Sequence, residues 1–496
     1  MLLKALNEKT KMIQHPKRYR HALCLYPYYS GDRGTGLDFF PPTGLEYVAT
    51  ALKGHVDQIS LVDLRYKRSL LSIRKMSEFI HRGIDLICVS NSWRAQYEKV
   101  CDYISQLPSA PTTVVGGREA TENVEDIFLR CPNVDAVVRG EGEQTIQELS
   151  DGRPWDQILG LSYRRNGAII HNPNRPLQPI EDINPPDRSL RQSRYFPVAH
   201  GIRMLPMEFD TVLGSRGCPY KCKFCTFSMN PLGQKRDYVA RSPESVVDEI
   251  EASKGNVIIF SDDNFFVKPD RVERICDLII ERGINKLYFA NARIEAAKYP
   301  HMLEKAYRAG FRMLLLGIES TSDRILEQLG KGFNTRQIRE AFTVFRRFPF
   351  FYHAYFIYGN IGETEQEMLS IPQFARELGV HTINLSRLRM DKFTPLRQLV
   401  ESTQGYWIGK KGKVYSQEFD SKKIKQIRNQ IRSRFYYRLE QLAKIRRTLN
   451  NCEILTYGQT AKLVLKLGLV SPLLLLDYVA NSIRRTFQRL VTKSCD

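Results

Sequence analysis

Three cysteines lie close together in the segment "GCPYKCKFC", residues 217–225. Cys218, Cys222 and Cys225 are spaced as C-x3-C-x2-C. An odd number of thiols cannot all pair as disulfides, and three are one fewer than a closed tetrahedral metal site uses. Thiolates at this spacing suit zinc or an iron–sulfur cluster. The segment therefore predicts a metal centre with one position left for another ligand.

Two kinds of centre are compatible with this spacing. Zinc would need a fourth Cys or His from a distant part of the chain. A 4Fe–4S cluster on three cysteines would keep one iron open to an exogenous ligand, which is the arrangement of a catalytic centre. The spacing favours the cluster. The other cysteines are scattered along the chain, and their distribution is typical of small buried residues.

The bulk composition limits the class of protein. A chain of 496 residues predicts two to four domains at about 150 residues each, and a hydrophobic content of 42% is ample for packed cores. Ten cysteines, thinly spread apart from the one cluster, do not fit a secreted disulfide scaffold. We find no signal-peptide pattern and no apolar run of about 18 residues that would span a bilayer. We expect a cytoplasmic protein.

The first part of the chain, residues 20–150, alternates between strand-like and helix-like patterns. Strand-like runs cover residues 21–27, 57–64, 84–92, 111–117 and the start of 134–149. Helical patterns cover residues 41–55, 69–83, 95–108 and the rest of 134–149. This alternation predicts a Rossmann-like, doubly wound parallel sheet with helices on both faces. Ligands of such sheets bind at the carboxyl ends of the strands.

A second alternating series follows a Pro-rich and Asn-rich stretch at residues 151–205, which we interpret as a linker with a hairpin turn at Asn166-Gly167. Residues 206–395 contain six strand-like runs with helical patterns between them. Six such units predict a partial (β/α)6 barrel of the TIM type. The three cysteines follow its first strand, at the barrel end where chemistry gathers.

The two ends of the chain have a different character. Residues 1–19 are a short extension, and residues 396–496 form a C-terminal region that we expect to be helical. Within it, residues 421–450 carry ten Lys and Arg against one Glu, and a strongly apolar segment follows. The net charge of the whole chain is +20. A solvated helix face, a nucleic-acid interface, a core helix covering the barrel mouth and a helix in the membrane interface are all compatible with this pattern.

The cysteine segment resembles the cluster-binding signature of radical S-adenosylmethionine (SAM) enzymes, in which an aromatic residue precedes the last cysteine, here Phe224. Further segments of the barrel region resemble the same family: "FSDDNFF" at 260–266, "LLLGIES" with "LEQLGKG" within 314–332, and "YGNIGET" at 358–364. The last of these departs from the family pattern at Ile361, where proline is more common. The resemblance covers residues 208–395.

The N-terminal region resembles the cobalamin-binding (B12-binding) domain that precedes the barrel in the cobalamin-dependent class of these enzymes. The segments that carry this resemblance are "PPTGLEYVATAL" at 41–52, "VVGGREAT" at 114–121 and "VDAVVRGEGEQTIQEL" at 134–149. The D-x-H-x-x-G pattern, whose His binds cobalt, is missing, because Asp63 is followed by Leu, Arg, Tyr and Lys. The class generally binds cobalamin without a protein His, so this departure is compatible with the resemblance.

The resemblance implies roles for residues at the strand ends. Cys218, Cys222 and Cys225 would hold the 4Fe–4S cluster, and SAM would chelate the open iron. Residues expected to contact SAM are Phe224, Ser261, Asp262, Asp263, Arg293, Glu319 and Ser320. Residues expected on the cobalamin side are Tyr26, Pro27, Asn91, Arg94, Gly116, Gly117, Gly140, Glu141 and Gly142. No residue is assigned a catalytic role beyond these.

The function implied is cleavage of SAM to a 5′-deoxyadenosyl radical, followed by cobalamin-dependent methylation of an unactivated carbon. A small hydrophobic or lipid-like substrate is the favoured class, since the basic and apolar C-terminal region suits contact with the inner face of a membrane. An electron donor such as flavodoxin or ferredoxin is implied as a partner. The alternatives are a radical SAM cyclase or rearrangement enzyme without methyl transfer, and a zinc-stabilised nucleic-acid-binding protein. Nucleic acid is not the expected partner.

Overall fold

The computed structural model describes residues 18–28, 39–199, 201–225 and 229–472. These residues divide into two compact units. Of the described residues, the first unit contains 18–28, 42–178 and 182–193. The second unit contains 39–41, 179–181 and the described residues from 194 onward. Each unit is described by itself below.

The first unit is built on a seven-stranded sheet in the order β2-β1-β3-β4-β5-β6-β7. The parallel strands are β1 (His21–Tyr26), β2 (Gln58–Asp63), β3 (Leu86–Ser90), β4 (Thr112–Gly116) and β5 (Ala136–Val138). They are mostly buried apolar runs, as strands covered on both faces must be. The chain order reverses between β1 and β3, which is where ligands of doubly wound sheets bind.

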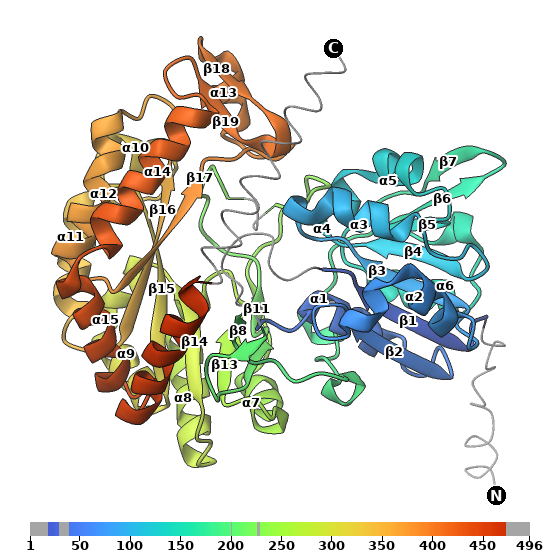
Figure 1. Cartoon of the computed structure of the whole chain (residues 1–496), viewed down its shortest axis with the longest axis horizontal. Helices are drawn as coiled ribbons and strands as arrows, with labels where there is room; N and C mark the ends of the chain where they lie inside the picture. Colours follow the sequence, from blue (N-terminus) through green and yellow to red (C-terminus); the bar gives the residue numbers. More distant parts are fainter. Residues whose placement is uncertain (1–17, 29–38, 200, 226–228, 473–496) are drawn as a thin grey trace, which may run out of the picture. The chain divides into compact units, whose positions relative to one another are not determined.

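Helices cover both faces of this sheet (Figure 1). They are α1 (Thr43–Ala51), α2 (Ile73–Ile80), α3 (Tyr97–Ile104), α4 (Arg118–Glu122), α5 (Val124–Arg130) and α6 (Glu143–Ser150). α1 packs beside α6, whereas α3 packs beside α5. Right-handed crossovers on either side of the reversal place these two pairs on opposite faces. The predicted doubly wound fold is confirmed.

The sheet extends beyond residue 150, into the stretch that we interpreted as a linker. β6 (Leu161–Arg165) and β7 (Ala168–His171) form an antiparallel hairpin on the β5 edge. Asn166 and Gly167 have φ values of 51° and 79°, which are the left-handed values that a tight hairpin turn needs. The predicted turn is confirmed, and its strands belong to the first unit.

The second unit holds a six-stranded parallel sheet whose strands are paired in chain order. They are β10 (Phe209–Val212), β13 (Val257–Phe260), β14 (Leu287–Ala292), β15 (Phe311–Glu319), β16 (Phe351–Tyr358) and β17 (Thr382–Arg387). The helices between them are α7 (Pro243–Ala252), α8 (Pro269–Glu281), α9 (Pro300–Arg308), α10 (Asp323–Gln328), α11 (Thr335–Phe345) and α12 (Glu365–Leu378). Among the described residues β10 and β17 remain the two edges, so the predicted partial barrel is confirmed.

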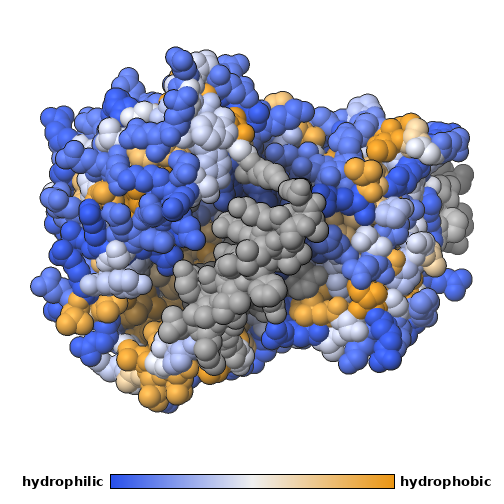
Figure 2. Space-filling model, turned by 45° about the horizontal axis from the view of Figure 1, so that its top comes forward, coloured by the Kyte–Doolittle hydropathy of each residue, from blue (hydrophilic) through white to orange (hydrophobic). Residues whose placement is uncertain are grey.

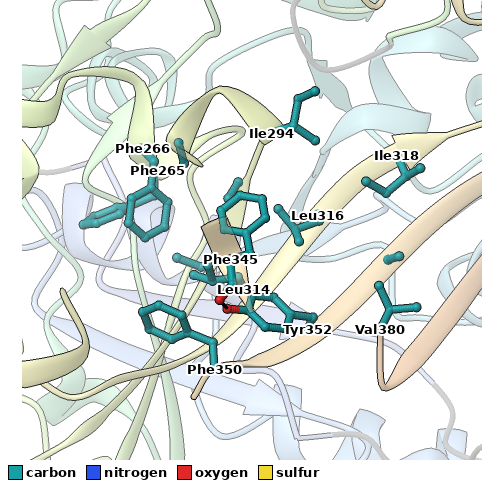
Figure 3. Packing of buried hydrophobic residues seen from close by; sticks show 14 of the residues in the cluster. Phe265, Phe266, Ile294, Leu314, Leu316, Ile318, Phe345, Phe350, Tyr352 and Val380 are labelled. Carbon is teal, nitrogen blue, oxygen red and sulfur yellow. Dashed lines mark hydrogen bonds between the residues drawn. The ribbon is translucent and has the colours of Figure 1, made fainter. Parts of the chain in front are cut away.

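Alternation along β15 separates the core from the concave face of this sheet. Leu314, Leu316 and Ile318 pack against the helices in the cluster that also holds Phe265 and Phe345 (Figure 3). Successive side chains of a strand point to opposite faces, so the residues between them face the inside of the barrel. The register shifts at the end of β15, between Gly317 and Glu319, and such a bulge re-aims the side chains at the strand end.

The C-terminal region begins with a small module at the carboxyl end of the barrel. It contains α13 (Arg397–Ser402) and a hairpin of β18 (Tyr406–Ile408) with β19 (Val414–Ser416). Residues of this module share one hydrophobic cluster with Phe224 of the cysteine segment. We therefore name residues 388–416 the cap module. Sequence patterns predicted only helices here, because two three-residue strands are too short to show a period.

The helices α14 (Ser421–Tyr436) and α15 (Leu439–Asn451) complete the described C-terminal region, with a further helix at 457–472. Ile424, Ile427, Ile431 and Phe435 recur at helical spacing along α14 and are buried in the barrel core. The basic residues of α14 therefore occupy its outer side. The surface seen in Figure 2 is mainly hydrophilic, with smaller apolar patches. No helix of the described residues is long and apolar enough to cross a membrane.

Candidate functional site

The cysteine segment is a loop held in place by main-chain hydrogen bonds. It follows β10 through the short strand β11 (Ser215–Arg216), which pairs with β12 (Val239–Ala240). The Lys223 N–H donates to the Leu329 carbonyl at 2.9 Å, and the Lys223 carbonyl accepts from the Leu396 N–H at 3.1 Å. Contacts on both sides fix the loop between α10 and the cap module.

Glycine is required at the start of this loop. Gly217 has a φ of 78°, and an added Cβ would lie 2.8 Å from the carbonyl oxygen of Arg236. Any other residue would strain the backbone or displace the segment that precedes β12. The carboxylate of Asp263, just beyond the end of β13, accepts a hydrogen bond from the Gly217 N–H. The predicted SAM residue Asp263 therefore lies beside the first cysteine.

A guanidinium group lies against the second cysteine. Arg293 follows β14, is 7% exposed, and places Nη1 3.3 Å from Sγ of Cys222. Glu295 accepts from Nη2 at 2.8 Å, and the ring of Tyr220 lies 3.8 Å from the guanidinium carbon. Burial alone would lower the pKa of Arg293, but Glu295 and the Cys222 thiol raise it. The guanidinium therefore places a fixed positive charge against the sulfur of Cys222.

The three thiols fit a 4Fe–4S cluster by their chemistry. All are half-buried, and none of them is in a disulfide with another described cysteine. Burial raises the pKa of Cys218, so that this thiol stays protonated until a metal takes the place of its proton. Among the described residues, no three Cys, His, Asp or Glu side chains converge as one metal ion requires. A cluster binds each thiolate through a different iron and does not need such convergence.

Asp262 holds two strand ends together rather than facing solvent. It is fully buried, accepts from the Gly214 N–H at 2.9 Å, and accepts the hydroxyl of Ser215. Its carbonyl oxygen accepts from Asn291 at 3.0 Å. Burial raises the pKa of Asp262 to about 6. Ser261 is exposed beside it, and contact of either residue with SAM stays a prediction.

Glu319 and Lys331 form a buried ion pair that the sequence did not reveal. Lys331 Nζ lies 3.4 Å from Glu319 Oε1, and the two residues are 4% and 8% exposed. Burial raises the pKa of Glu319, and Lys331 lowers it. Lys331 also lies 5.9 Å from the ring centre of Phe224 in the cysteine loop. The pair could not be predicted from the sequence, because the bulge in β15 sets the direction of the Glu319 side chain.

The segment "YGNIGET" folds into a turn after β16 that buries a carboxylate. Glu363 accepts from the N–H of Asn360 at 2.9 Å and from its side-chain amide at 3.0 Å. Burial raises the pKa of Glu363 to about 7. The next residue, Thr364, caps α12 in a capping box with Glu367. The turn therefore fixes the position of Ile361, where the family more often has proline.

The raised pKa of Glu363 predicts a dependence of stability on pH. The folded state binds this proton more tightly than the unfolded state, so stability is fully present below pH 4.5 and falls as pH rises through 7. Glu363→Gln removes the buried charge. The parent loses stability between pH 5 and pH 8 and the variant does not. The free energy of unfolding of the variant, relative to the parent, should therefore rise by up to about 3 kcal/mol over this range. Urea unfolding at both pH values measures this, and equal effects would contradict it.

Aromatic residues gather at the strand reversal of the first unit. Tyr26 ends β1, and its hydroxyl accepts from Trp93 Nε1 at 2.9 Å. The ring of Tyr28 lies 4.3 Å from that of Tyr26, and its hydroxyl accepts from the N–H groups of Ser92 and Trp93. Trp93 is 60% exposed. This gives the strand ends an apolar platform suited to a large planar ligand, and Pro27 lies buried within it.

Close backbone approach marks the neighbouring strand ends, β3 and β4. Asn91 is fully buried, and among the described residues its Oδ1 has no hydrogen-bond partner. Gly117 has a φ of 108°, and an added Cβ would lie 2.8 Å from the Asn91 carbonyl oxygen. Gly116 pairs with Ser90 at the ends of the same strands. An unpartnered buried acceptor beside a crowded glycine fits a ligand that approaches the backbone here.

The remaining cobalamin-side residues are held by protein contacts. Arg94 pairs with Glu119 at 3.1 Å and also with Glu122. Gly140 donates to Thr121 at 3.1 Å, and Glu141 accepts from the Gln178 N–H at 3.2 Å. Gly142 precedes α6. Their contact with cobalamin stays a prediction.

Arg65 stands two residues after Asp63, at the place of the missing His. Its guanidinium lies 4.7 Å from the ring centre of Tyr26 and pairs with Asp63 at 2.6 Å. A guanidinium has no lone pair to offer a metal. The residues at this strand end therefore fit cobalamin bound without a protein ligand to cobalt. Sequence reasoning missed Arg65, Tyr28 and Trp93, although aromatic residues directly after a strand were a usable signal for the last two.

Comparisons with known proteins identify a family for each of the two regions. The family model of the radical SAM superfamily matches residues 212–375, and the model of the B12 binding domain matches residues 34–150. An uncharacterized methyltransferase of Pyrococcus horikoshii is 31% identical over 352 residues, which cover 68% of this chain and 74% of the relative.

More distant relatives carry other printed activities. An anaerobic magnesium-protoporphyrin IX monomethyl ester cyclase of Cereibacter sphaeroides is 25% identical over 75% of this chain and 62% of its own length. A hopanoid C-3 methylase of Methylococcus capsulatus is 25% identical over 61% of this chain and 59% of its own length. The chain thus spans under two thirds of these two relatives.

Solved structures share the fold. The cobalamin-dependent S-adenosylmethionine radical enzyme OxsB with aqua-cobalamin bound matches with a TM-score of 0.65 and 17% identity, over 90% of this chain and 72% of that one. The radical S-adenosylmethionine methyltransferase TsrM from Kitasatospora setae matches with a TM-score of 0.62 and 17% identity, over 78% of this chain and 77% of that one. The chain therefore belongs to the radical SAM superfamily, in the cobalamin-dependent group that carries a B12-binding domain, and its cofactors are a 4Fe–4S cluster, SAM and cobalamin.

Proposed function

We propose that this enzyme transfers a methyl group to an unactivated carbon of a hydrophobic, lipid-like substrate. One observation carries the proposal: the same chain contains a loop with three thiols and a strand end of the B12-binding type. At that strand end Asp63 pairs with Arg65, and no His that could bind cobalt follows it. Two such cofactors in one enzyme are suited to generating a substrate radical and then supplying it with a methyl group.

When bound, the cluster would supply the electron that splits SAM, and cobalamin would carry the methyl group. The residues of the chain orient and shield these groups. Arg293 holds a positive charge against Cys222, and Gly217 lets the loop pack against the segment that precedes β12. Glu319 and Lys331 fix the end of β15 behind the loop, and burial of this pair excludes water from it.

A hydrophobic substrate is supported by the relatives and by an exposed apolar helix. The related hopanoid methylase and porphyrin ester cyclase carry hydrophobic molecules in their names. In the helix at 457–472, Val464 and Leu465 are 57% and 68% exposed, whereas Val470 on the opposite side is buried. A helix that is apolar on both sides is unusual at a surface in water. Together with Lys462, the helix at 457–472 suits contact with an anionic membrane. If the protein did not sediment with anionic vesicles, this contact would be ruled out.

The second candidate function is cyclisation, because the chain resembles the magnesium-protoporphyrin ester cyclase. The mass of the product distinguishes methyl transfer from cyclisation. We would incubate the reconstituted enzyme with SAM that carries a deuterated methyl group and with a lipid extract of its host. Methylation adds one labelled methyl group to a lipid, and the Cys222→Ser variant supplies the blank. A cyclised product without label would replace the proposal with the second candidate.

A further inference from the structure

Three arginine side chains gather around one tyrosine where β16 and β17 end. Tyr358 and Arg387 are register partners at the ends of these two strands, and Arg428 and Arg432 belong to α14. We name these four residues the arginine site. We infer that the arginine site binds the phosphate group of a phosphate ester. The inference goes beyond the proposed function and does not rest on it.

The strand residues of the arginine site face the helices rather than the inside of the barrel. Tyr358 belongs to the hydrophobic cluster that the helices cover. Its register partner Arg387 points to the same face of the sheet, since side chains alternate in step on neighbouring strands. The arginine site therefore lies outside the barrel, away from its concave face.

The helix α14 runs alongside β17 in the opposite direction. Near the end of the helix, the hydroxyl of Tyr436 accepts from the Ile383 N–H at 2.9 Å and donates to the Ile383 carbonyl at 2.8 Å. Near its start, Cδ1 of Ile424 lies 3.2 Å from where a Cβ on Gly359 would stand, directly after β16. The end of α14 is therefore beside the start of β17, and the start of α14 is beside the strand ends.

The spacing along α14 brings Arg428 and Arg432 toward the level of Arg387. Four residues of a helix rise about 6 Å, and two residues of a strand rise about 6.6 Å. Two four-residue steps back from Tyr436 reach Arg428, and they match the two strand steps that end at Arg387. The positive charges of all three arginines act on the hydroxyl of Tyr358 and oppose the rise in its pKa that burial causes.

The charges of the arginine site have no acidic partner. Among the described residues, none of its three arginines forms an ion pair with a carboxylate. Arg387 donates through Nε to the Val414 carbonyl at 3.0 Å, and burial lowers its pKa. Nε of Arg428 is buried and finds no acceptor in the described part of the chain. Tyr358 is 5% exposed, and its hydroxyl makes no hydrogen bond to a described residue. Buried donors of this kind point to a bound acceptor.

A phosphate group fits this set of donors better than a carboxylate does. Its oxygens accept forked pairs of guanidinium hydrogen bonds, and its second negative charge is matched by the further arginines. Like charges that lie together repel one another, so a bound dianion also relieves that repulsion.

An apolar surface beside the arginine site suits the rest of the ligand. The ring of Tyr415 lies 3.9 Å from the guanidinium carbon of Arg387. The ring of Trp407 stacks on that of Tyr415 at 6.0 Å and is 47% exposed. A ligand held by its phosphate therefore has aromatic rings nearby against which an organic part can pack.

Titration calorimetry with inorganic phosphate tests the inference. We would titrate the reconstituted protein at constant ionic strength, with chloride as the balancing anion. Arg428→Gln/Arg432→Gln should bind phosphate at least about 10-fold more weakly than the parent, because charge-assisted hydrogen bonds are lost. Tyr358→Phe removes one hydroxyl and no charge, and should weaken binding roughly 5-fold. Lys422→Gln/Arg434→Gln removes the same charge from other, exposed positions of α14 and should bind as the parent does.

A second ligand identifies what carries the phosphate. Dihexanoyl phosphatidic acid is a soluble lipid whose phosphate is a monoester. If it binds at least about 10-fold more tightly than inorganic phosphate, and Trp407→Ala removes that gain, the arginine site takes a lipid headgroup. Equal affinity of the two ligands assigns the site to a free phosphate or a small phosphate ester. The inference is wrong if the parent binds neither ligand saturably, or if Arg428→Gln/Arg432→Gln binds them as tightly as the parent.

Discussion

Cys222→Ser is expected to remove most of the cluster and to reduce SAM cleavage below detection. A serine hydroxyl does not ionise near neutral pH and is a hard ligand, so it cannot replace the sulfur that lies 3.3 Å from Nη1 of Arg293. Loss of a residue that only supports a ligand costs about 10- to 100-fold, and loss of the ligand itself should cost more. Iron and sulfide analysis together with the yield of 5′-deoxyadenosine measures the effect.

Cys276→Ala is the matched control for this variant. Cys276 is fully buried in the barrel core, on α8, away from the cysteine loop. We expect a modest loss of stability from the missing sulfur, with iron content and SAM cleavage unchanged. If Cys222→Ser kept its iron, or if Cys276→Ala lost it, the assignment of the three loop cysteines as ligands would be wrong.

Lys331→Met is expected to reduce the free energy of unfolding by about 3–5 kcal/mol, because removing one partner of a buried ion pair leaves the other charge unpaired. The partner is Glu319, whose Oε1 lies 3.4 Å from Lys331 Nζ, and both residues are nearly fully buried. Lys331 lowers the pKa of Glu319, so without it this carboxyl takes up a proton more readily. The loss should therefore shrink as pH falls. Urea unfolding at pH 5 and 8 measures both effects.

Two companion variants make this result specific. Glu319→Gln combined with Lys331→Met removes both charges and should recover most of the lost stability, since a neutral pair has no buried charge to leave unpaired. Arg336→Met breaks an exposed pair with Glu340, whose side chains are 81% and 62% exposed, and should cost less than about 1 kcal/mol. A loss below about 1 kcal/mol for Lys331→Met would show that the pair contributes as little as a surface one.

Features with a local cause were predictable from the sequence. Both sheets could be predicted because apolar runs of strand length alternate with helical patterns. The thiols of Cys218, Cys222 and Cys225 could be assigned to one loop because their spacing is short. The turn at Asn166-Gly167 could be placed because few residue pairs accept left-handed conformations at both positions.

Features that depend on contacts between distant residues could not be predicted. Arg293 and Cys222 are 71 residues apart, and Lys331 and Glu319 meet only because a bulge turns the end of β15. The cap module packs on Phe224 through a hairpin too short to show a period. Asp262 binds Gly214 and Ser215, and this could not be predicted because a strand-end carboxylate looks the same in the sequence whether it binds neighbouring residues or faces a ligand.

Anaerobic reconstitution with iron, sulfide and cobalamin tests the central claim most directly. The account predicts about four irons and about four sulfides per chain, bound cobalamin, and 5′-deoxyadenosine formed from SAM once a reductant is added. The cluster should be missing when Cys218, Cys222 and Cys225 are replaced together. Zinc bound in place of iron, with no cleavage of SAM, would contradict the account.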